Sequence, residues 1–125
     1  MKTAIIYASV HHGNTKKIID EIARTNEVDL IDATQVTEKD LSCYDLIGFA
    51  SGVYYGKFHQ SVLKFASVNL IENKNVFLMC TYGGSEAFKS MESIIDDKHD
   101  KLVGRFSQKT RTNLPRFCFF SFFPV

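Results

Sequence analysis

The sequence predicts a single α/β domain built on a mostly parallel sheet of about five strands. Apolar runs of strand length alternate along the chain with segments of helical period. Alternation of this kind favours parallel pairing through right-handed crossovers. The length of 125 residues suits one domain. Neither an internal repeat nor a linker interrupts the pattern.

The expected strands are short apolar runs separated by polar or glycine-containing segments. They occupy Ala4–Tyr7, Glu27–Asp32, Asp45–Ser51, Asn75–Thr81 and Lys101–Ser107. The run Asp45–Ser51 is apolar almost throughout, as expected of a strand that is covered on both faces. Parallel strands of this type predict helices on both sides of the sheet.

The expected helices each carry an apolar stripe at helical spacing. They span Lys16–Arg24, Phe58–Leu70 and Ala87–Asp97. Between the second and third strands, Thr34–Tyr44 has little periodic signal, and we expect a loop with one helical turn at Glu38–Leu41. The segment Gly52–Lys57 is predicted to be a turn-rich loop.

Composition narrows the class of protein. The net charge of +1 gives no broad electrostatic case for binding nucleic acid or an anionic membrane. Cys43, Cys80 and Cys118 are widely spaced and odd in number, which argues against a disulfide framework and against a CxxC metal or redox site. We expect Cys80 to be a buried small residue. No signal peptide and no apolar run of about 20 residues is seen, so we expect a cytoplasmic protein.

The stretch Thr3–Ile19 has the order of an anion site: strand, glycine-containing loop, helix start. The first N–H groups of a helix lack intrahelical partners and carry the positive end of the dipole. A phosphate can accept hydrogen bonds from them, and Ser9, Asn14 and Thr15 can add side-chain donors. The alternative is an ordinary strand–helix turn in which Asn14 or Thr15 is a cap.

Three glycine-containing loops follow strands at the same predicted edge of the sheet: residues 8–15, 51–57 and 81–85. In open parallel sheets, ligands bind outside the carboxyl ends of the strands, near the switch in strand order. Tyr54, Tyr55 and Tyr82 lie in the second and third loops. A ligand with a phosphate at one end and a flat ring at the other fits this set, although the tyrosines could instead pack on the domain.

At these loops the chain resembles the flavodoxins and flavodoxin-like proteins. YASVHHGNT (7–15) is similar to the family's phosphate loop, and ASGVYYGK (50–57) and CTYGG (80–84) are similar to its two flavin-facing loops. The three matches occur in the family's order and spacing, and together they are specific. The resemblance covers residues 1–107, which we expect to form the flavodoxin-like domain.

The resemblance implies FMN as the cofactor and electron transfer by the flavin itself. It also implies a five-stranded parallel sheet of order 2-1-3-4-5, a fold that is itself a standard example of binding at the strand-order switch. No catalytic side chain and no metal are implied. The residues implied to hold the phosphate are Ser9, His11, His12, Gly13, Asn14 and Thr15. Those implied to face the ring are Ser51, Gly52, Val53, Tyr54, Tyr55, Thr81, Tyr82, Gly83 and Gly84.

Three features depart from the family pattern. His11 and His12 stand where many flavodoxins have hydroxyl residues, and the chain is near neutral where electron carriers are usually strongly acidic. The third departure is residues 108–125, a Phe-rich segment without helical pattern in place of the family's last helix. Burying a Phe is worth about 1.5–3 kcal/mol. We therefore expect this segment to fold back over the sheet or to form a homodimer contact.

Three functions remain open. The first is an FMN-binding carrier that shuttles electrons between a reductase and an acceptor protein. The second is an FMN-dependent NAD(P)H:quinone-type reductase, and the third is a flavin-free binding module on the same fold. No second nucleotide motif such as GxGxxG is present, and Lys57 and His59 are more typical of a solvated helix start than of acid–base catalysis. These absences favour the carrier.

Overall fold

The computed structural model describes residues 2–8, 14–82 and 87–109. The strands are β1 (Thr3–Ala8), β2 (Val28–Asp32), β3 (Leu46–Tyr54), β4 (Lys57–Phe58), β5 (Asn75–Tyr82) and β6 (Lys101–Lys109). The helices are α1 (Asn14–Thr25), α2 (Gln60–Asn69) and α3 (Lys89–Asp97). Every strand and helix expected from the sequence is therefore present, with boundaries that differ by a few residues.

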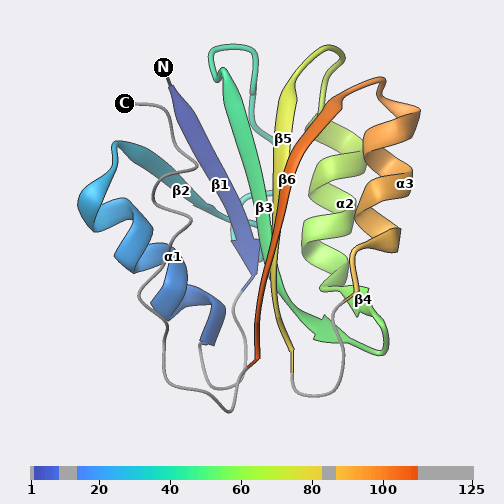
Figure 1. Cartoon of the computed structure of the whole chain (residues 1–125). Helices are drawn as coiled ribbons and strands as arrows, with labels where there is room; N and C mark the ends of the chain where they lie inside the picture. Colours follow the sequence, from blue (N-terminus) through green and yellow to red (C-terminus); the bar gives the residue numbers. More distant parts are fainter. Residues whose placement is uncertain (1, 9–13, 83–86, 110–125) are drawn as a thin grey trace.

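The sheet has the strand order β2-β1-β3-β5-β6, and all of these neighbours pair in parallel (Figure 1). This is the predicted order 2-1-3-4-5, counted over the five main strands. The short strand β4 lies off this path and pairs antiparallel with the end of β3. The predicted fold class is confirmed.

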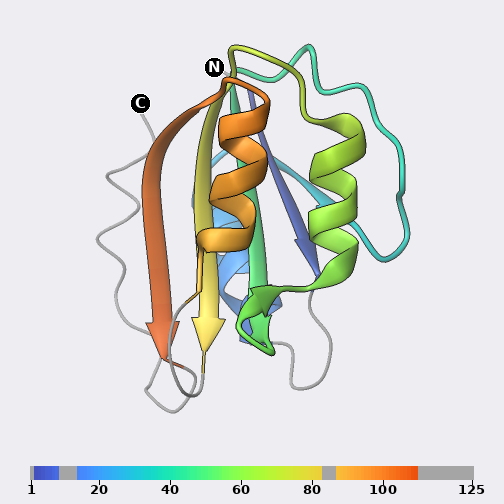
Figure 2. The ribbon, with the colours of Figure 1, turned by 90° about the vertical axis from the view of Figure 1, so that its right-hand side faces the viewer.

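Helix α1 covers one face of the sheet, and α2 and α3 cover the other (Figures 1 and 2). Two buried clusters fill these interfaces, because alternate residues of a strand point to opposite faces. On the α1 side, Ile18, Ile19 and Ile22 are buried against β1, β3 and β5. On the other side, Phe65 of α2 and Met91 of α3 are buried in the second cluster. Cys80 is fully buried there as expected.

One glycine is required by close packing inside the sheet. Gly48 of β3 is paired with Phe77 of β5, and both lie in the α1-side layer. A Cβ added at Gly48 would lie 2.2 Å from the Cζ atom of the Phe77 ring. The ring of Phe77 is only 1% exposed and lies edge-on to Phe106 of β6 at 6.4 Å between centroids. The Phe77 ring thus fills the space that a side chain at position 48 would occupy.

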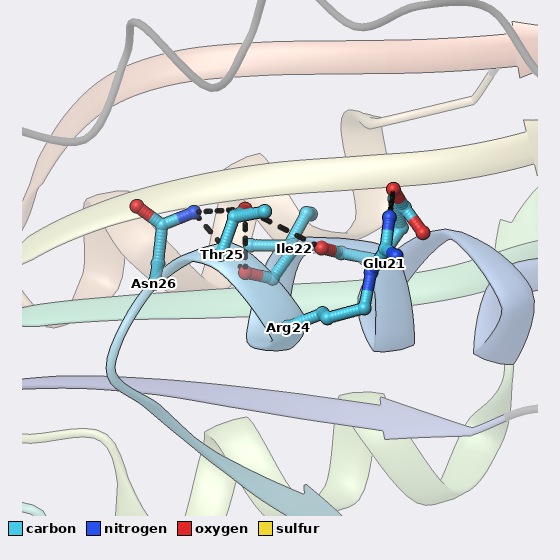
Figure 3. Close-up of polar contacts among 5 residues, drawn as sticks. All are labelled: Glu21, Ile22, Arg24, Thr25 and Asn26. Carbon is cyan, nitrogen blue, oxygen red and sulfur yellow. Dashed lines mark hydrogen bonds and ion pairs between the residues drawn. The ribbon is translucent and has the colours of Figure 1, made fainter.

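Side chains in the last turn of α1 and directly after it form hydrogen bonds and an ion pair with one another and with the helix backbone (Figure 3). The Asn26 amide Nδ2 donates to the carbonyl of Ile22 at 3.1 Å, and the backbone N–H of Asn26 donates to the same carbonyl at 3.0 Å. Thr25 Oγ1 donates to the carbonyl of Glu21 at 3.4 Å, and Arg24 forms an ion pair with Glu21. These contacts end the helix just before β2 begins.

Two local predictions are wrong. The helical turn expected at Glu38–Leu41 is absent; the structure has turns at residues 33–35 and 42–43 instead. Both turns are held by aspartates that accept backbone N–H groups two residues ahead, Asp32 from Thr34 and Asp40 from Ser42. These bonds compete with helix formation. The predicted loop 52–57 is instead a β-hairpin, because β3 continues to Tyr54 and pairs with β4.

The Phe-rich segment lies largely beyond Lys109, outside the described residues. The expectation that residues 108–125 pack on the sheet or between two copies, and that they replace a last helix, therefore stays a prediction. Strand β6 itself runs two residues past the predicted end of the domain at Ser107.

Candidate functional site

The three predicted loops leave neighbouring strands at one edge of the sheet. Ala8 at the end of β1 pairs with Ser51 of β3, and Gly52 of β3 pairs with Thr81 of β5. The strand order reverses between β1 and β3: the connection from β1 leads outward to β2 on one side, and the connection from β3 leads outward to β5 on the other. This edge is where a parallel α/β sheet binds ligands.

Part of the predicted site lies outside the described residues. This applies to Ser9, His11, His12, Gly13, Gly83 and Gly84, and to the side chain of Asn14. The described members are Thr15, Ser51, Gly52, Val53, Tyr54, Tyr55, Thr81 and Tyr82. They come from the start of α1, the β3–β4 hairpin and the end of β5.

Two of the described members meet directly. Thr15, in the first turn of α1, and Thr81, near the end of β5, have their Oγ1 atoms 3.0 Å apart. Their side chains are buried, at 2% and 4% exposure. This hydrogen bond fixes the helix start, which is the predicted anion site, against the strand that leads into the third loop.

Ser51 joins the hairpin to the start of α2. Its side chain is fully buried, and its Oγ accepts the backbone N–H of His59 at 2.9 Å and donates to the carbonyl of Gly52 at 2.6 Å. His59 in turn is the N-cap of α2, with Nδ1 accepting the N–H of Ser61 at 3.1 Å. The predicted ring-facing hydroxyl of Ser51 is therefore engaged with backbone groups, and His59 has the helix-start role expected of it.

The hairpin presents its two tyrosines differently. Tyr54 is half-buried, and its ring stands edge-on to the imidazole of His59 with centroids 5.2 Å apart. Tyr55 is at the tip and is fully exposed, with φ +52°, followed by Gly56 at φ +76°. Non-glycine residues rarely adopt positive φ. An exposed aromatic ring is thus held in a costly backbone conformation at the predicted ligand-binding edge.

The start of α1 is basic. Its first turn holds Lys16 and no acidic residue. Lys16 Nζ lies 2.5 Å from Asp20 and 5.8 Å from the centre of the Tyr7 ring. The hydrogen bond to Asp20 raises the pKa of Lys16, and burial raises the pKa of Tyr7. Lys16 and Tyr7 were not singled out from the sequence, although a lysine at a helix start, against the dipole, is a usable signal.

Two further features were sought in the described part of the chain, a metal site and a membrane-spanning helix. No group of three or more His, Cys, Asp or Glu side chains able to hold a metal occurs among the described residues. Within the same residues, no helix is long and apolar enough to cross a membrane. The described part of the site thus consists of hydroxyls, backbone groups, a lysine and aromatic rings.

Fold and site together define an open parallel α/β protein with a ligand edge at the strand-order switch. The chain belongs to the flavodoxin domain family, whose model matches residues 4–121. An uncharacterized protein of Methanocaldococcus jannaschii is 36% identical over 118 residues, which cover 94% of this chain and 74% of that protein.

Solved structures with low sequence identity share the fold. Flavodoxin 2 from Bacillus cereus superposes with a TM-score of 0.69 at 24% identity, over 90% of this chain and 88% of that one. A flavoprotein from Lactobacillus acidophilus, solved in complex with FMN, superposes with a TM-score of 0.63 at 18% identity. That match covers 85% of this chain and 92% of the flavoprotein.

Proposed function

We propose that the chain binds FMN at the carboxyl edge of its sheet and acts as an electron carrier. The observation that carries the proposal is the fully exposed ring of Tyr55 on the same edge as the basic start of α1. FMN has a flat ring and a phosphate. The ring of Tyr55 can stack on the flat ring, and the start of α1 can hold the phosphate. Membership of the flavodoxin domain family, and the FMN complex of the Lactobacillus flavoprotein, support it.

The described residues fit this ligand. The N–H groups at the start of α1 point away from the helix and are available to an anion. Lys16, which is paired with Asp20, lies in the same helix turn, and a phosphate there would offset the unfavourable position of that lysine near the helix dipole. Ser9, His11, His12, Gly13, Asn14 and Thr15 are the residues proposed to surround the phosphate.

The hairpin would hold the ring. Tyr55 offers an aromatic face to stack on, while the contact between Tyr54 and His59 steadies the hairpin beneath it. Backbone groups of residues 51–55 and 81–84 are the proposed hydrogen-bonding partners. Bound FMN supplies one- and two-electron redox chemistry, and the chain's own task is to orient it and tune its potential. Gly52 and Gly56 are candidates for a peptide that turns with redox state, because glycine reaches positive φ without steric cost.

The experiment is a fluorescence titration of the apoprotein with FMN and with riboflavin, which lacks the phosphate. We expect FMN to bind far more tightly than riboflavin. Tyr55→Ala should weaken FMN binding about two- to tenfold, the value of one aromatic contact. The control Val68→Ala, on the exposed side of α2, should leave the affinity unchanged. Equal affinity for the two ligands would contradict the phosphate site, and an unchanged affinity in Tyr55→Ala would contradict stacking.

Turnover separates a carrier from a reductase. The carrier proposal predicts negligible NAD(P)H oxidation by the FMN-loaded protein in the presence of a quinone. Rapid, saturable turnover would instead assign the protein to the NAD(P)H:quinone-type reductases. Failure to bind micromolar FMN would leave the flavin-free binding module as the remaining function.

A further inference from the structure

The edge that carries the proposed flavin site is also the edge where unpaired positive charge gathers. Four lysines with exposed side chains lie there: Lys17 in the first turn of α1, Lys57 in β4, Lys64 in α2 and Lys89 at the start of α3. None of the four forms an ion pair with another described residue. Figure 1 shows the starts of α1 and α2 and strand β4 at this same edge.

Most of the acidic side chains near this edge are already neutralised. Asp20 pairs with Lys16 at 2.5 Å, and Glu92 pairs with Arg105 at 3.0 Å. Asp32, at the end of β2, is the remaining described carboxylate there. The balance of described charge at this edge is therefore positive.

The opposite edge differs, because it mixes both signs. At the amino ends of the strands, the backbone N–H of Lys2 donates to Asp45 at 2.9 Å, and that of Lys74 donates to Asp100 at 2.7 Å. Acidic residues such as Glu72 are interspersed with these lysines. The net charge of +1 thus conceals an uneven distribution.

Helix stability does not explain the positions of Lys17 and Lys89. Lys17 and Lys89 lie in the first turns of α1 and α3, where the helix dipole disfavours positive charge. The first turns of α1 and α2 contain no acidic residue, although that is where an acidic side chain would be favourable. Positions that oppose folding energetics are a reason to look for a role in binding.

We propose that this basic edge docks a redox partner protein with an acidic surface. The inference rests on the proposed function, since docking there would bring the partner's redox group close to the flavin. The four lysines come from separate elements on both sides of the sheet, so they surround this edge and favour the acidic surface of a folded protein that covers the edge. A long nucleic acid is a poorer fit, because the chain's net charge of +1 gives little overall attraction to a polyanion.

The test measures binding, not turnover, with two small haem proteins of opposite charge: acidic cytochrome b5 and basic cytochrome c. Isothermal titration gives the affinity, and NMR chemical-shift changes locate the contact. We expect cytochrome b5 to bind at low ionic strength, with shifts at the start of α1, the β3–β4 hairpin and the start of α2. Raising the salt concentration should weaken this binding, because salt screens exposed charges. Cytochrome c should bind more weakly.

Two matched double variants test whether binding depends on the lysines of the basic edge. Lys57→Gln/Lys64→Gln removes two charges from the basic edge and should weaken cytochrome b5 binding by about tenfold. Lys39→Gln/Lys101→Gln removes two exposed charges elsewhere and should have little effect. Equal losses in both pairs, or tighter binding of cytochrome c, would overturn the proposal. Because the readout needs no flavin, an absence of FMN would defeat the proposed function and still leave this result interpretable.

Discussion

The hydrogen bond between Thr15 and Thr81 gives a quantitative test of how the site is assembled. Both side chains are buried, and their Oγ1 atoms are 3.0 Å apart. Thr15→Val or Thr81→Val keeps the side-chain shape and leaves one buried hydroxyl without its partner. Each single change should cost about 1–3 kcal/mol of unfolding free energy. The double variant removes both hydroxyls and should be closer to the wild type than the sum of the singles.

Urea unfolding of the apoprotein, followed by circular dichroism, measures the four corners of this cycle. The two changes should be non-additive by at least about 1 kcal/mol. Thr37→Val, at an exposed threonine in the loop after β2, is the control and should stay within about 0.5 kcal/mol of the wild type. If the singles simply add, the two hydroxyls do not support one another and this account of the helix start is wrong.

Three further predictions concern the scaffold. Gly48→Ala should lower the free energy of unfolding by about 1–3 kcal/mol, because its methyl meets the buried Phe77 ring. Adding Phe77→Leu, a smaller side chain, should recover part of this loss in urea unfolding. An unchanged urea midpoint in Gly48→Ala would refute the contact. Burial, with a 2.7 Å hydrogen bond to Asp29, raises the pKa of Tyr44 to about 12. The folded state therefore holds this proton more tightly, so stability should fall by up to about 1.4 kcal/mol per pH unit between about pH 10 and pH 12. The raised pKa of Tyr7 adds to this decline, so Tyr44→Phe should make it shallower without abolishing it. Removing residues 110–125, which keeps all of β6, should lower the melting temperature; an unchanged melting temperature with an unchanged monomer in light scattering would exclude both roles expected for the Phe-rich segment.

Much of the fold could be predicted because buried positions are occupied by apolar residues at the spacing of a strand or a helix. Strands covered on both faces read as apolar runs, and Ile18, Ile19 and Ile22 mark the buried stripe of α1. The hairpin could not be predicted in the same way. Its turn places Tyr55 at positive φ, whereas recognisable hairpin turns use Asn or Gly there. Asp32 and Asp40 likewise look like ordinary polar residues until their turns are seen.

The sequence could predict where in the fold the candidate site lies, but not which side chains contact one another there. Strand order alone brings the three loops to one edge, and the structure joins Thr15 to Thr81 there. Sequence spacing does not reveal which way a hydroxyl points. That Ser51 faces the ring stays a prediction, and the structure adds that its Oγ bonds the backbone of Gly52 and His59. The difference between a packed Tyr54 and an exposed Tyr55 also depends on the hairpin, which the sequence does not signal.

The proposed function requires that this chain bind FMN. The most direct measurement is to release any small molecule from the purified protein by heat, and to identify and quantify it by absorbance and mass spectrometry. We expect FMN, close to a single molecule for each chain, or the same stoichiometry after the apoprotein is loaded with FMN. Protein that releases no flavin and takes up none at micromolar FMN would contradict it.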